Sequence, residues 1–133
     1  MKLVIGGYAQ GKLGYVLSKY HLKEHQVWDG VLPDNDALSE KGILPDEQVV
    51  INHFHQWVKE SMSGERCPEE ELLSFLGHCK HCIIICDEVG NGIVPVDAFE
   101  RDYRERVGRL LIALAKKAEE VERVICGIGQ KIK

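Results

Sequence analysis

The sequence predicts an α/β fold with a mostly parallel sheet and helices on both faces. Short apolar runs alternate with segments of helical periodicity along the chain, and one run, Cys82–Cys86, is apolar at every position. A continuous apolar run is typical of a parallel strand that is covered on both faces. Alternating strands and helices join through right-handed crossovers, so the strands run in one direction.

The composition predicts one domain that spans residues 1–133. The chain is 44% hydrophobic and 29% charged, and it is long enough to bury a core of its own. Its net charge of −4, with Lys and Arg spread along the chain, predicts no nucleic-acid partner. No apolar run approaches the roughly 20 residues of a membrane span. The five cysteines, an odd number, and the lack of a secretory signal predict reduced thiols in the cytoplasm.

The first twenty residues predict a strand, a glycine-rich turn and a helix. Residues 3–5 form the apolar run, and apolar residues from Leu13 to Tyr20 fall on one side of the helix. Backbone N–H groups of such a turn and of the helix N-terminus can hold a phosphate, and Lys12 adds a positive charge. The alternative is a tight turn in which the glycines only relieve backbone strain.

The spacing from Gly6 to Gly11 and Lys12 matches the phosphate-binding pattern G-x-x-x-x-G-K, but Leu13 stands where that pattern has Ser or Thr. Leucine has no hydroxyl for Mg²⁺, so the sequence favours phosphate binding over phosphoryl transfer. If a nucleoside triphosphate binds, Lys12 would neutralise its β- and γ-phosphates. The predicted nucleotide-binding residues are Gly6, Gly7, Tyr8, Ala9, Gln10, Gly11, Lys12 and Leu13.

The middle of the chain predicts one strand and two helices. Residues 26–29 read as a strand that ends in Asp29, and residues 30–45 read as a loop. Asp46 is expected to cap a helix that Val50, Phe54, Trp57 and Val58 continue at helical spacing as far as Ser63. Pro68, followed by three glutamates, predicts the start of another helix that reaches about Cys79.

The last third predicts a strand, a long helix and a final strand. The apolar strand at residues 82–86 ends in Asp87 and Glu88 and is followed by a glycine-rich loop at residues 89–95. Asp97 and Glu100 form a capping-box pattern at the start of the long helix. Residues 121–126 read as the last strand, which Gly127–Gly129 breaks before a basic tail.

Acidic residues follow two of the predicted strands, at the edge of the sheet where ligands of such folds bind. By position, Asp29 is the expected Mg²⁺-linked acid, and its alternative role is that of a turn residue before Gly30. Either Asp87 or Glu88 could hold a metal or accept a proton from a substrate hydroxyl.

A zinc site is a further possibility, because His78, Cys79, His81 and Cys82 lie close together in the sequence and His53 and His55 stand upstream. The Cys79–Cys82 spacing suits zinc, but no second C-x-x-C is present to complete four ligands. The better interpretation is that the cysteines belong to the core, beside surface histidines.

Two stretches resemble the adenosylcobinamide kinase / adenosylcobinamide-phosphate guanylyltransferase family. Residues 4–12 are similar to its N-terminal P-loop, and residues 88–95, 104, 108–109 and 126–133 are similar to its C-terminal hallmark. The resemblance implies a P-loop NTPase-like (RecA-like) fold, ATP or GTP with Mg²⁺, a corrinoid partner, cobalamin biosynthesis and a homotrimer.

The resemblance also implies roles for Glu88, Arg104 and Arg109, which stand at family positions. It favours Glu88 over Asp87 as the functional acid, and Asp87 then caps the following loop. The alternative for the two arginines is that they are solvated helix charges.

The chain departs from the family at three places. Leu13 replaces the Ser or Thr, Leu111 replaces an Asn, and the basic segment whose His takes the nucleotidyl group has no counterpart. Residues 27–30 resemble the family's later strand with its Walker-B-type acid. These departures predict loss of the guanylyltransferase step. Phosphoryl transfer from ATP or GTP to a corrinoid hydroxyl is then expected, or, in the alternative, binding of a nucleotide, phosphate or corrinoid without turnover.

Overall fold

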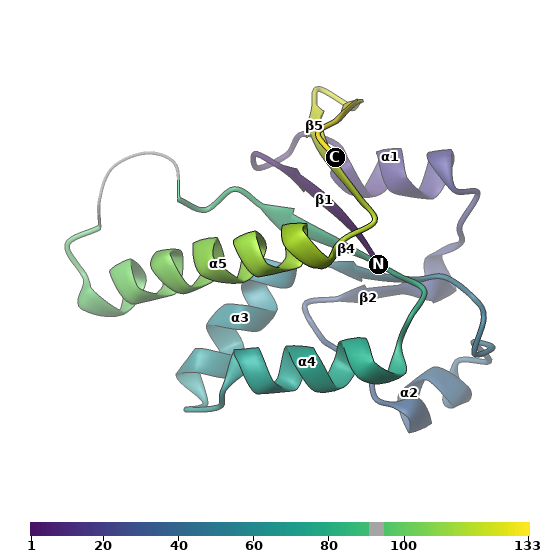
Figure 1. The fold of residues 1–133 in the computed structure, drawn as a ribbon, viewed down its shortest axis with the longest axis horizontal. Coiled ribbons are helices and arrows are strands. Elements are labelled where there is room, and N and C mark those ends of the chain that lie inside the picture. Colours follow the sequence, from purple (N-terminus) through teal and green to yellow (C-terminus); the bar gives the residue numbers. More distant parts are fainter. Residues whose placement is uncertain (91–94) are drawn as a thin grey trace.

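A six-stranded sheet forms the centre of the molecule in the computed structural model, which describes residues 1–90 and 95–133 (Figure 1). The strand order is β2-β3-β4-β1-β5-β6. The first five strands are parallel and β6 runs antiparallel to β5. The predicted α/β fold with a mostly parallel sheet is therefore confirmed. The strands are β1 (Lys2–Gly6), β2 (Val27–Asp29), β3 (Val49–Asn52), β4 (Cys82–Asp87), β5 (Glu120–Ile125) and β6 (Ile128–Lys131).

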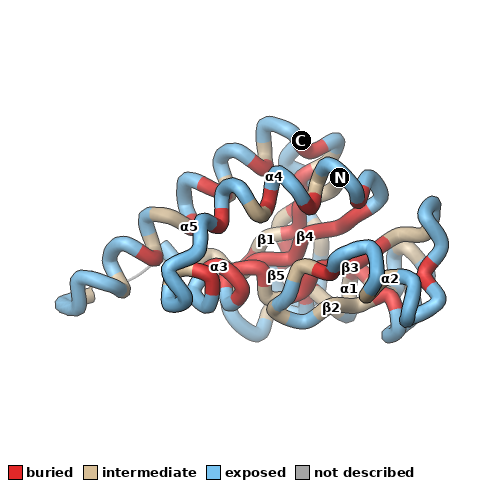
Figure 2. The backbone as a smooth tube through the Cα atoms, turned by 90° about the horizontal axis from the view of Figure 1, so that it is seen from below, coloured by how far each residue is buried: buried red, intermediate tan, exposed pale blue. Residues whose placement is uncertain are grey.

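Helices cover both faces of the sheet, with α1 on one side and α3, α4 and α5 on the other (Figure 1). They are α1 (Lys12–Lys19), α2 (Asn35–Glu40), α3 (Phe54–Ser63), α4 (Pro68–His78) and α5 (Ala98–Lys117), with a 3₁₀ turn η1 at Glu24–Gln26. Buried residues concentrate along the central strands and on the inward sides of these helices (Figure 2). In the described parts of the chain, no helix has the length and apolar character needed to cross a bilayer.

The core has two layers because alternate residues of a strand point to opposite faces of the sheet. The layer under α1 contains Val4, Val16, Val50, Ile83, Ile85 and Val124. The larger layer includes Leu3, Ile51, Phe54, Ile84, Val107 and Leu114.

The predicted helix from Asp46 to Ser63 is wrong in its first half. Residues 49–52 form β3, which pairs with β2 and β4, and α3 begins only at Phe54. Val50 and Phe54 are four residues apart, as on one helix face, but they lie in different core layers. The β-branched run Val49-Val50-Ile51 suits a pleated, fully buried strand, and this preference wins over the helical spacing.

Two other stretches contain more regular structure than predicted. The expected loop at residues 30–45 includes α2, which starts where the Asp34 side chain accepts a hydrogen bond from Ala37 N at 2.8 Å. The expected basic tail forms β6. Cys126 and Gly127 both have positive φ angles, 51° and 75°, which a two-residue hairpin turn of type I′ requires.

The long helix α5 begins at the predicted N-cap, but only half of the predicted capping box is formed, because the Glu100 side chain does not bond back to the backbone of Asp97. The Asp97 side chain accepts hydrogen bonds from Phe99 N at 2.7 Å and Glu100 N at 3.3 Å, so the N-cap is confirmed. The carboxylate of Glu100 pairs with Lys59 of α3 at 2.6 Å. This ion pair links the two helices.

A polar cluster fixes α1 against the sheet. Tyr15 and Lys19, one turn apart on α1, both donate hydrogen bonds to the buried Glu122 of β5. Burial alone would raise the pKa of Glu122, but the hydrogen bonds from Lys19 and Tyr15 outweigh it and the pKa is lowered. Glu122 therefore stays ionised, and it holds the helix that follows the glycine-rich loop.

Candidate functional site

The loop between β1 and α1 lies at the carboxyl edge of the sheet. A Cβ atom at Gly6 would lie 2.5 Å from the carbonyl oxygen of Val124, so only glycine fits there. Gly11 caps α1 with a φ of 81°, in the left-handed region that favours glycine. Steric constraints alone therefore explain why glycine stands at both positions. Whether the loop binds phosphate depends on the groups around the two glycines.

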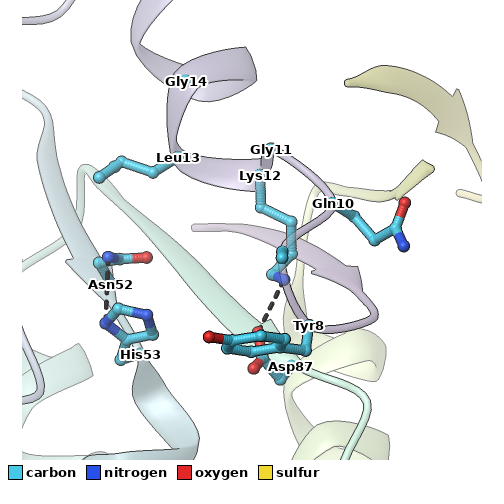
Figure 3. A pocket seen from close by; sticks show the side chains of 10 residues that line it. Tyr8, Gln10, Gly11, Lys12, Leu13, Gly14, Asn52, His53 and Asp87 are labelled. Atoms are coloured by element: carbon cyan, nitrogen blue, oxygen red, sulfur yellow. Dashed lines mark hydrogen bonds and ion pairs between the residues drawn. The ribbon is translucent and has the colours of Figure 1, made fainter. Parts of the chain in front are cut away.

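Lys12 is the first residue of α1 and is buried, with 7% of its surface exposed. Its Nζ donates to the Gly7 carbonyl oxygen at 2.7 Å and lies 2.7 Å from Asp87 Oδ1 (Figure 3). Asp87 ends β4 and stands beside Gly6 in the register of the two strands. A buried ammonium group needs such partners, because an unpaired buried charge is costly.

An open pocket of about 320 Å³ lies in front of this lysine. This volume falls at the lower end of the range for small-molecule sites, roughly 300–1,000 Å³. The first N–H groups of a helix have no partner within the helix, so those of α1 are available to an anion in the pocket. Leu13 follows Lys12 on α1, and its side chain lies on the side of the pocket where Asn52 is found (Figure 3). The lining residues are Tyr8, Ala9, Gln10, Gly11, Lys12, Leu13, Gly14, Asn52, His53 and Asp87.

The opposite wall of the pocket comes from the end of β3. Asn52 and His53 line it, and His53 has a left-handed backbone with φ 53°. Nδ1 of His53 lies 2.5 Å from Asp29 Oδ1, and Asn52 Nδ2 donates to the same oxygen at 3.0 Å. The structure therefore brings Asp29 to His53 and does not bring it to Lys12.

A second histidine holds Asp87. His55 is 8% exposed, and its Nδ1 accepts a hydrogen bond from Asp87 N at 3.2 Å. Because Nδ1 accepts, the ring proton of the neutral form is on Nε2, which lies 3.4 Å from Asp87 Oδ2. Burial lowers the pKa of His55, and the opposing attraction of Asp87 does not cancel this effect.

The lowered pKa of His55 predicts that stability falls as the pH drops below about 6.5. The folded state keeps the ring neutral, whereas the unfolded chain takes up a proton near the ordinary value of 6.5. The unfolded state then binds more protons, so the free energy of unfolding rises with pH across this window, by at most about 1.4 kcal/mol per pH unit. Urea unfolding at about pH 5 and about pH 7.5 would measure the difference in the free energy of unfolding between the two pH values. His55→Gln should reduce this difference. An unchanged difference in His55→Gln, or an equal reduction in the exposed-site control His81→Gln, would contradict it.

The other predicted site residues lie away from Lys12. Glu88 pairs with Arg123 of β5 at 3.0 Å, and Arg104 Nε donates to Val89 O at 2.7 Å. Arg109 is exposed on α5 and pairs with Glu105 one turn earlier at 3.7 Å. None of these residues is among the described residues that line the pocket. Part of the predicted glycine-rich loop, residues 91–94, lies outside the described residues.

Sequence reasoning did not place Asn52, His53 and His55 in the site. All three lie in the segment for which the helical spacing predicts a single helix. The available signal was the β-branched run that ends in a polar residue at Asn52.

The hairpin turn after β5 supports the loop from the other side. The Gln10 side chain points away from the pocket (Figure 3), and its Oε1 accepts a hydrogen bond from Cys126 N at 2.8 Å. The Gln10 carbonyl oxygen accepts another from Gly127 N at 2.8 Å. The C-terminal hairpin therefore holds the glycine-rich loop in place.

The cysteines of the possible zinc site belong to the core. Cys79 and Cys82 are both buried, whereas His78 and His81 are exposed. His78 is hydrogen-bonded through Nδ1 to the Ser74 carbonyl oxygen at 2.9 Å. Within residues 1–90 and 95–133, no three His, Cys, Asp or Glu side chains are grouped so that they could hold a metal ion.

The first strand of the mostly parallel sheet leads through a glycine-containing loop to a helix, and a buried lysine stands at the start of that helix. This arrangement defines a P-loop NTPase-like α/β fold. The family follows from sequence comparison. The model of the family described as "Cobinamide kinase / cobinamide phosphate guanyltransferase" matches residues 19–132, and the chain belongs to this family. The match begins at the last residue of α1, after the glycine-rich loop.

Two curated relatives carry the name "Bifunctional adenosylcobalamin biosynthesis protein CobU". The protein of Salmonella typhimurium is 37% identical over 119 residues, and that of Escherichia coli is 37% identical over 117 residues. Each alignment covers 74% of this chain and 65% of the relative, so the chain matches about two thirds of the length of these proteins.

Proposed function

We propose that this chain binds ATP or GTP in the pocket of the glycine-rich loop and transfers the terminal phosphate to a corrinoid hydroxyl in cobalamin biosynthesis. The observation that carries the proposal is the buried ammonium group of Lys12, held between a loop carbonyl and Asp87 in front of the pocket. The family description, which names a kinase of cobinamide, and the names of the two relatives support the corrinoid as acceptor.

Lys12 would exchange its partner when the polyphosphate binds. The β- and γ-phosphates offer it oxygens of higher negative charge than the Gly7 carbonyl, and the N–H groups at the start of α1 bind the same anion. Phosphate binding would then release the carboxylate of Asp87 from its ion pair.

The pocket fits Mg²⁺ only in part. Asp87 is the one carboxylate among the described residues that line it, and Leu13 offers no oxygen. Mg²⁺ often binds through one or two carboxylates, phosphate oxygens and waters, so Asp87 would be its protein ligand here. When bound, the ion would neutralise charge on the phosphates. We assign this role to Asp87 rather than to Asp29, because Asp29 is engaged by His53 and Asn52.

Leu13 favours a second candidate function, which is nucleotide binding without turnover. It lies in the pocket where the phosphate-binding pattern has a hydroxyl for the metal. The guanylyltransferase step is proposed to be lost, since the chain has no counterpart of the segment that accepts the nucleotidyl group.

Calorimetric titration of the full chain with ATP and GTP, with and without Mg²⁺, tests the binding proposal. A γ-phosphate transfer assay with cobinamide as acceptor, run in parallel, tests the reaction. Binding with transfer supports the kinase, binding without transfer leaves the second candidate, and no binding of either nucleotide overturns both.

Leu13→Ser is expected to strengthen the effect of Mg²⁺ on nucleotide binding. The new hydroxyl supplies one oxygen ligand, and an added polar contact of about 1 kcal/mol corresponds to a roughly fivefold change in affinity. The measurement is the ratio of dissociation constants with and without Mg²⁺. Leu17→Ser, one turn further along α1 and outside the pocket lining, is the matched control. A ratio that does not change in Leu13→Ser would show that this position is not what weakens the metal site.

Several expectations about the whole protein remain predictions. They are one domain at residues 1–133, a homotrimer, a cytoplasmic location and no nucleic-acid partner. Sedimentation velocity of the full chain would test the trimer.

A further inference from the structure

We propose that His53, oriented by Asp29, is the general base of this pocket and accepts the proton of the hydroxyl that attacks the terminal phosphate. The inference rests on the proposed function, because it needs a bound nucleoside triphosphate. It assigns the base to a residue outside the glycine-rich loop and outside β4.

The contact between Asp29 and His53 determines which ring nitrogen is free. An ionised carboxylate can only accept hydrogen bonds, so Nδ1 of His53, 2.5 Å from Asp29 Oδ1, carries the ring proton. Asn52 Nδ2 donates to the same carboxylate oxygen at 3.0 Å. It also lies 3.3 Å from Nδ1 of His53 (Figure 3). The lone pair of the neutral ring is therefore on Nε2, where it can accept a proton.

The backbone holds His53 at the pocket. His53 follows β3 and caps α3 with φ 53° and ψ 48°, a conformation that few residues other than glycine adopt. Such a conformation is unfavourable for a residue with a side chain and is often found at functional sites. The side chain is 37% exposed and lines the pocket across from Lys12, so an acceptor molecule can reach it.

The acids that were predicted to accept this proton are engaged elsewhere. Glu88 is paired with Arg123, and Asp87, which faces His55, takes the role of Mg²⁺ ligand once the bound phosphates have replaced it as the partner of Lys12. The groups around His53 are Asp29, Asn52 and the edge-on ring of His55, whose centroid is 5.7 Å away.

The step balances with the nucleoside triphosphate and an alcohol as the only reactants. The hydroxyl proton moves to Nε2 of His53 while the oxygen forms a bond to the γ-phosphorus. The bond from that phosphorus to the bridging oxygen breaks, and its electron pair leaves with the nucleoside diphosphate, whose charge Lys12 neutralises. Asp29 stabilises the imidazolium that results, and a proton returned to solvent completes the cycle.

The test is steady-state γ-phosphate transfer to cobinamide by the full chain and its variants His53→Gln and Asp29→Asn, with nucleotide affinity measured by titration. His53→Gln should lower kcat by about 100- to 10,000-fold, with the dissociation constant for the nucleotide changed less than about threefold. Asp29 is a positioning residue, so Asp29→Asn should lower kcat at unchanged nucleotide affinity, and Asp29→Glu should restore part of the rate. Unchanged nucleotide binding also shows that each variant is folded. The control His81→Gln, at an exposed site, should keep the rate of the unmodified chain.

Full transfer activity in His53→Gln overturns the assignment, as does nucleotide binding without any turnover in the unmodified chain. In both cases nucleotide binding stands. Failure of ATP and GTP to bind the unmodified chain overturns the proposed function and this inference together.

Discussion

Replacing Lys12 by Met is expected to weaken binding of ATP or GTP by about 10- to 100-fold. Methionine keeps much of the length of the side chain but removes the ammonium group. A hydrogen bond to a charged group contributes about 1.5–3 kcal/mol, and 1.4 kcal/mol corresponds to a factor of ten in affinity. Calorimetric titration measures the loss, and Lys23→Met, at an exposed lysine, should leave the affinity unchanged. An affinity that survives in Lys12→Met would place the nucleotide somewhere other than this pocket.

The same substitution should also destabilise the protein, and a double variant separates the two effects. The side chain of Asp87 is only 15% exposed, and removal of Lys12 leaves its carboxylate without a cation. Removing one partner of a buried pair costs about 3–5 kcal/mol, whereas removing both charges costs much less. Lys12→Met/Asp87→Asn should therefore recover most of the lost stability in urea unfolding without recovering nucleotide binding. If stability and binding return together, loss of binding in the single variant reflects unfolding and not the missing charge.

Truncating Phe54 to Ala should lower the free energy of unfolding by about 3–5 kcal/mol, because the substitution leaves a cavity in a filled core. Phe54 is 0% exposed and stacks on Trp57, with ring centroids 5.4 Å apart. It is the first residue of α3, directly after His53, so the same loss should loosen the end of β3 that lines the pocket. Urea unfolding is the measurement. Leu73→Ala, at a residue 57% exposed on α4, should cost less than about 1 kcal/mol.

A double variant tests whether residues 49–58 form a strand followed by a helix. Val50 and Phe54 belong to different core layers, so the losses in Val50→Ala and Phe54→Ala should add within about 0.5 kcal/mol. On a single helix the two side chains would be neighbours, and their effects would be coupled. A large coupling energy would therefore contradict β3.

Much of the fold can be predicted from the sequence because local signals agree in most segments. The apolar run of β4, the Asp97 cap of α5 and the glycine-containing turn after β1 each point to one local structure. The sequence does not predict β3, because the four-residue spacing from Val50 to Phe54 fits a helix as well as it fits a strand followed by a turn. Only the pairing of residues 49–52 with β2 and β4 distinguishes the strand from a helix, and a short segment of sequence does not show which strands it pairs with.

In the site, too, local sequence predicts some features, whereas others depend on how the strands pair. Lys12 was identified from its spacing to Gly6, but its carboxylate partner depends on strand register. Asp87 lies directly beside Gly6, and Glu88 is the next residue. Successive side chains point to opposite faces of a sheet, so a one-residue difference decides which acid meets the lysine. Asp29 was expected near the metal, but β3 lies between β2 and β4, and this insertion places Asp29 beside His53.

The central position of β1 has a consequence for how the chain is made. Residues 2–6 pair with β4, about eighty positions later, and with β5 near the other end of the sequence. During synthesis on the ribosome, β1 therefore has no pairing partner until β4 has been made, and it has both partners only after β5. Contacts between such distant segments slow folding, and an unpaired apolar strand can associate with other chains in the meantime. Chaperone dependence and low yield at high expression temperature are the expected practical signs of this topology.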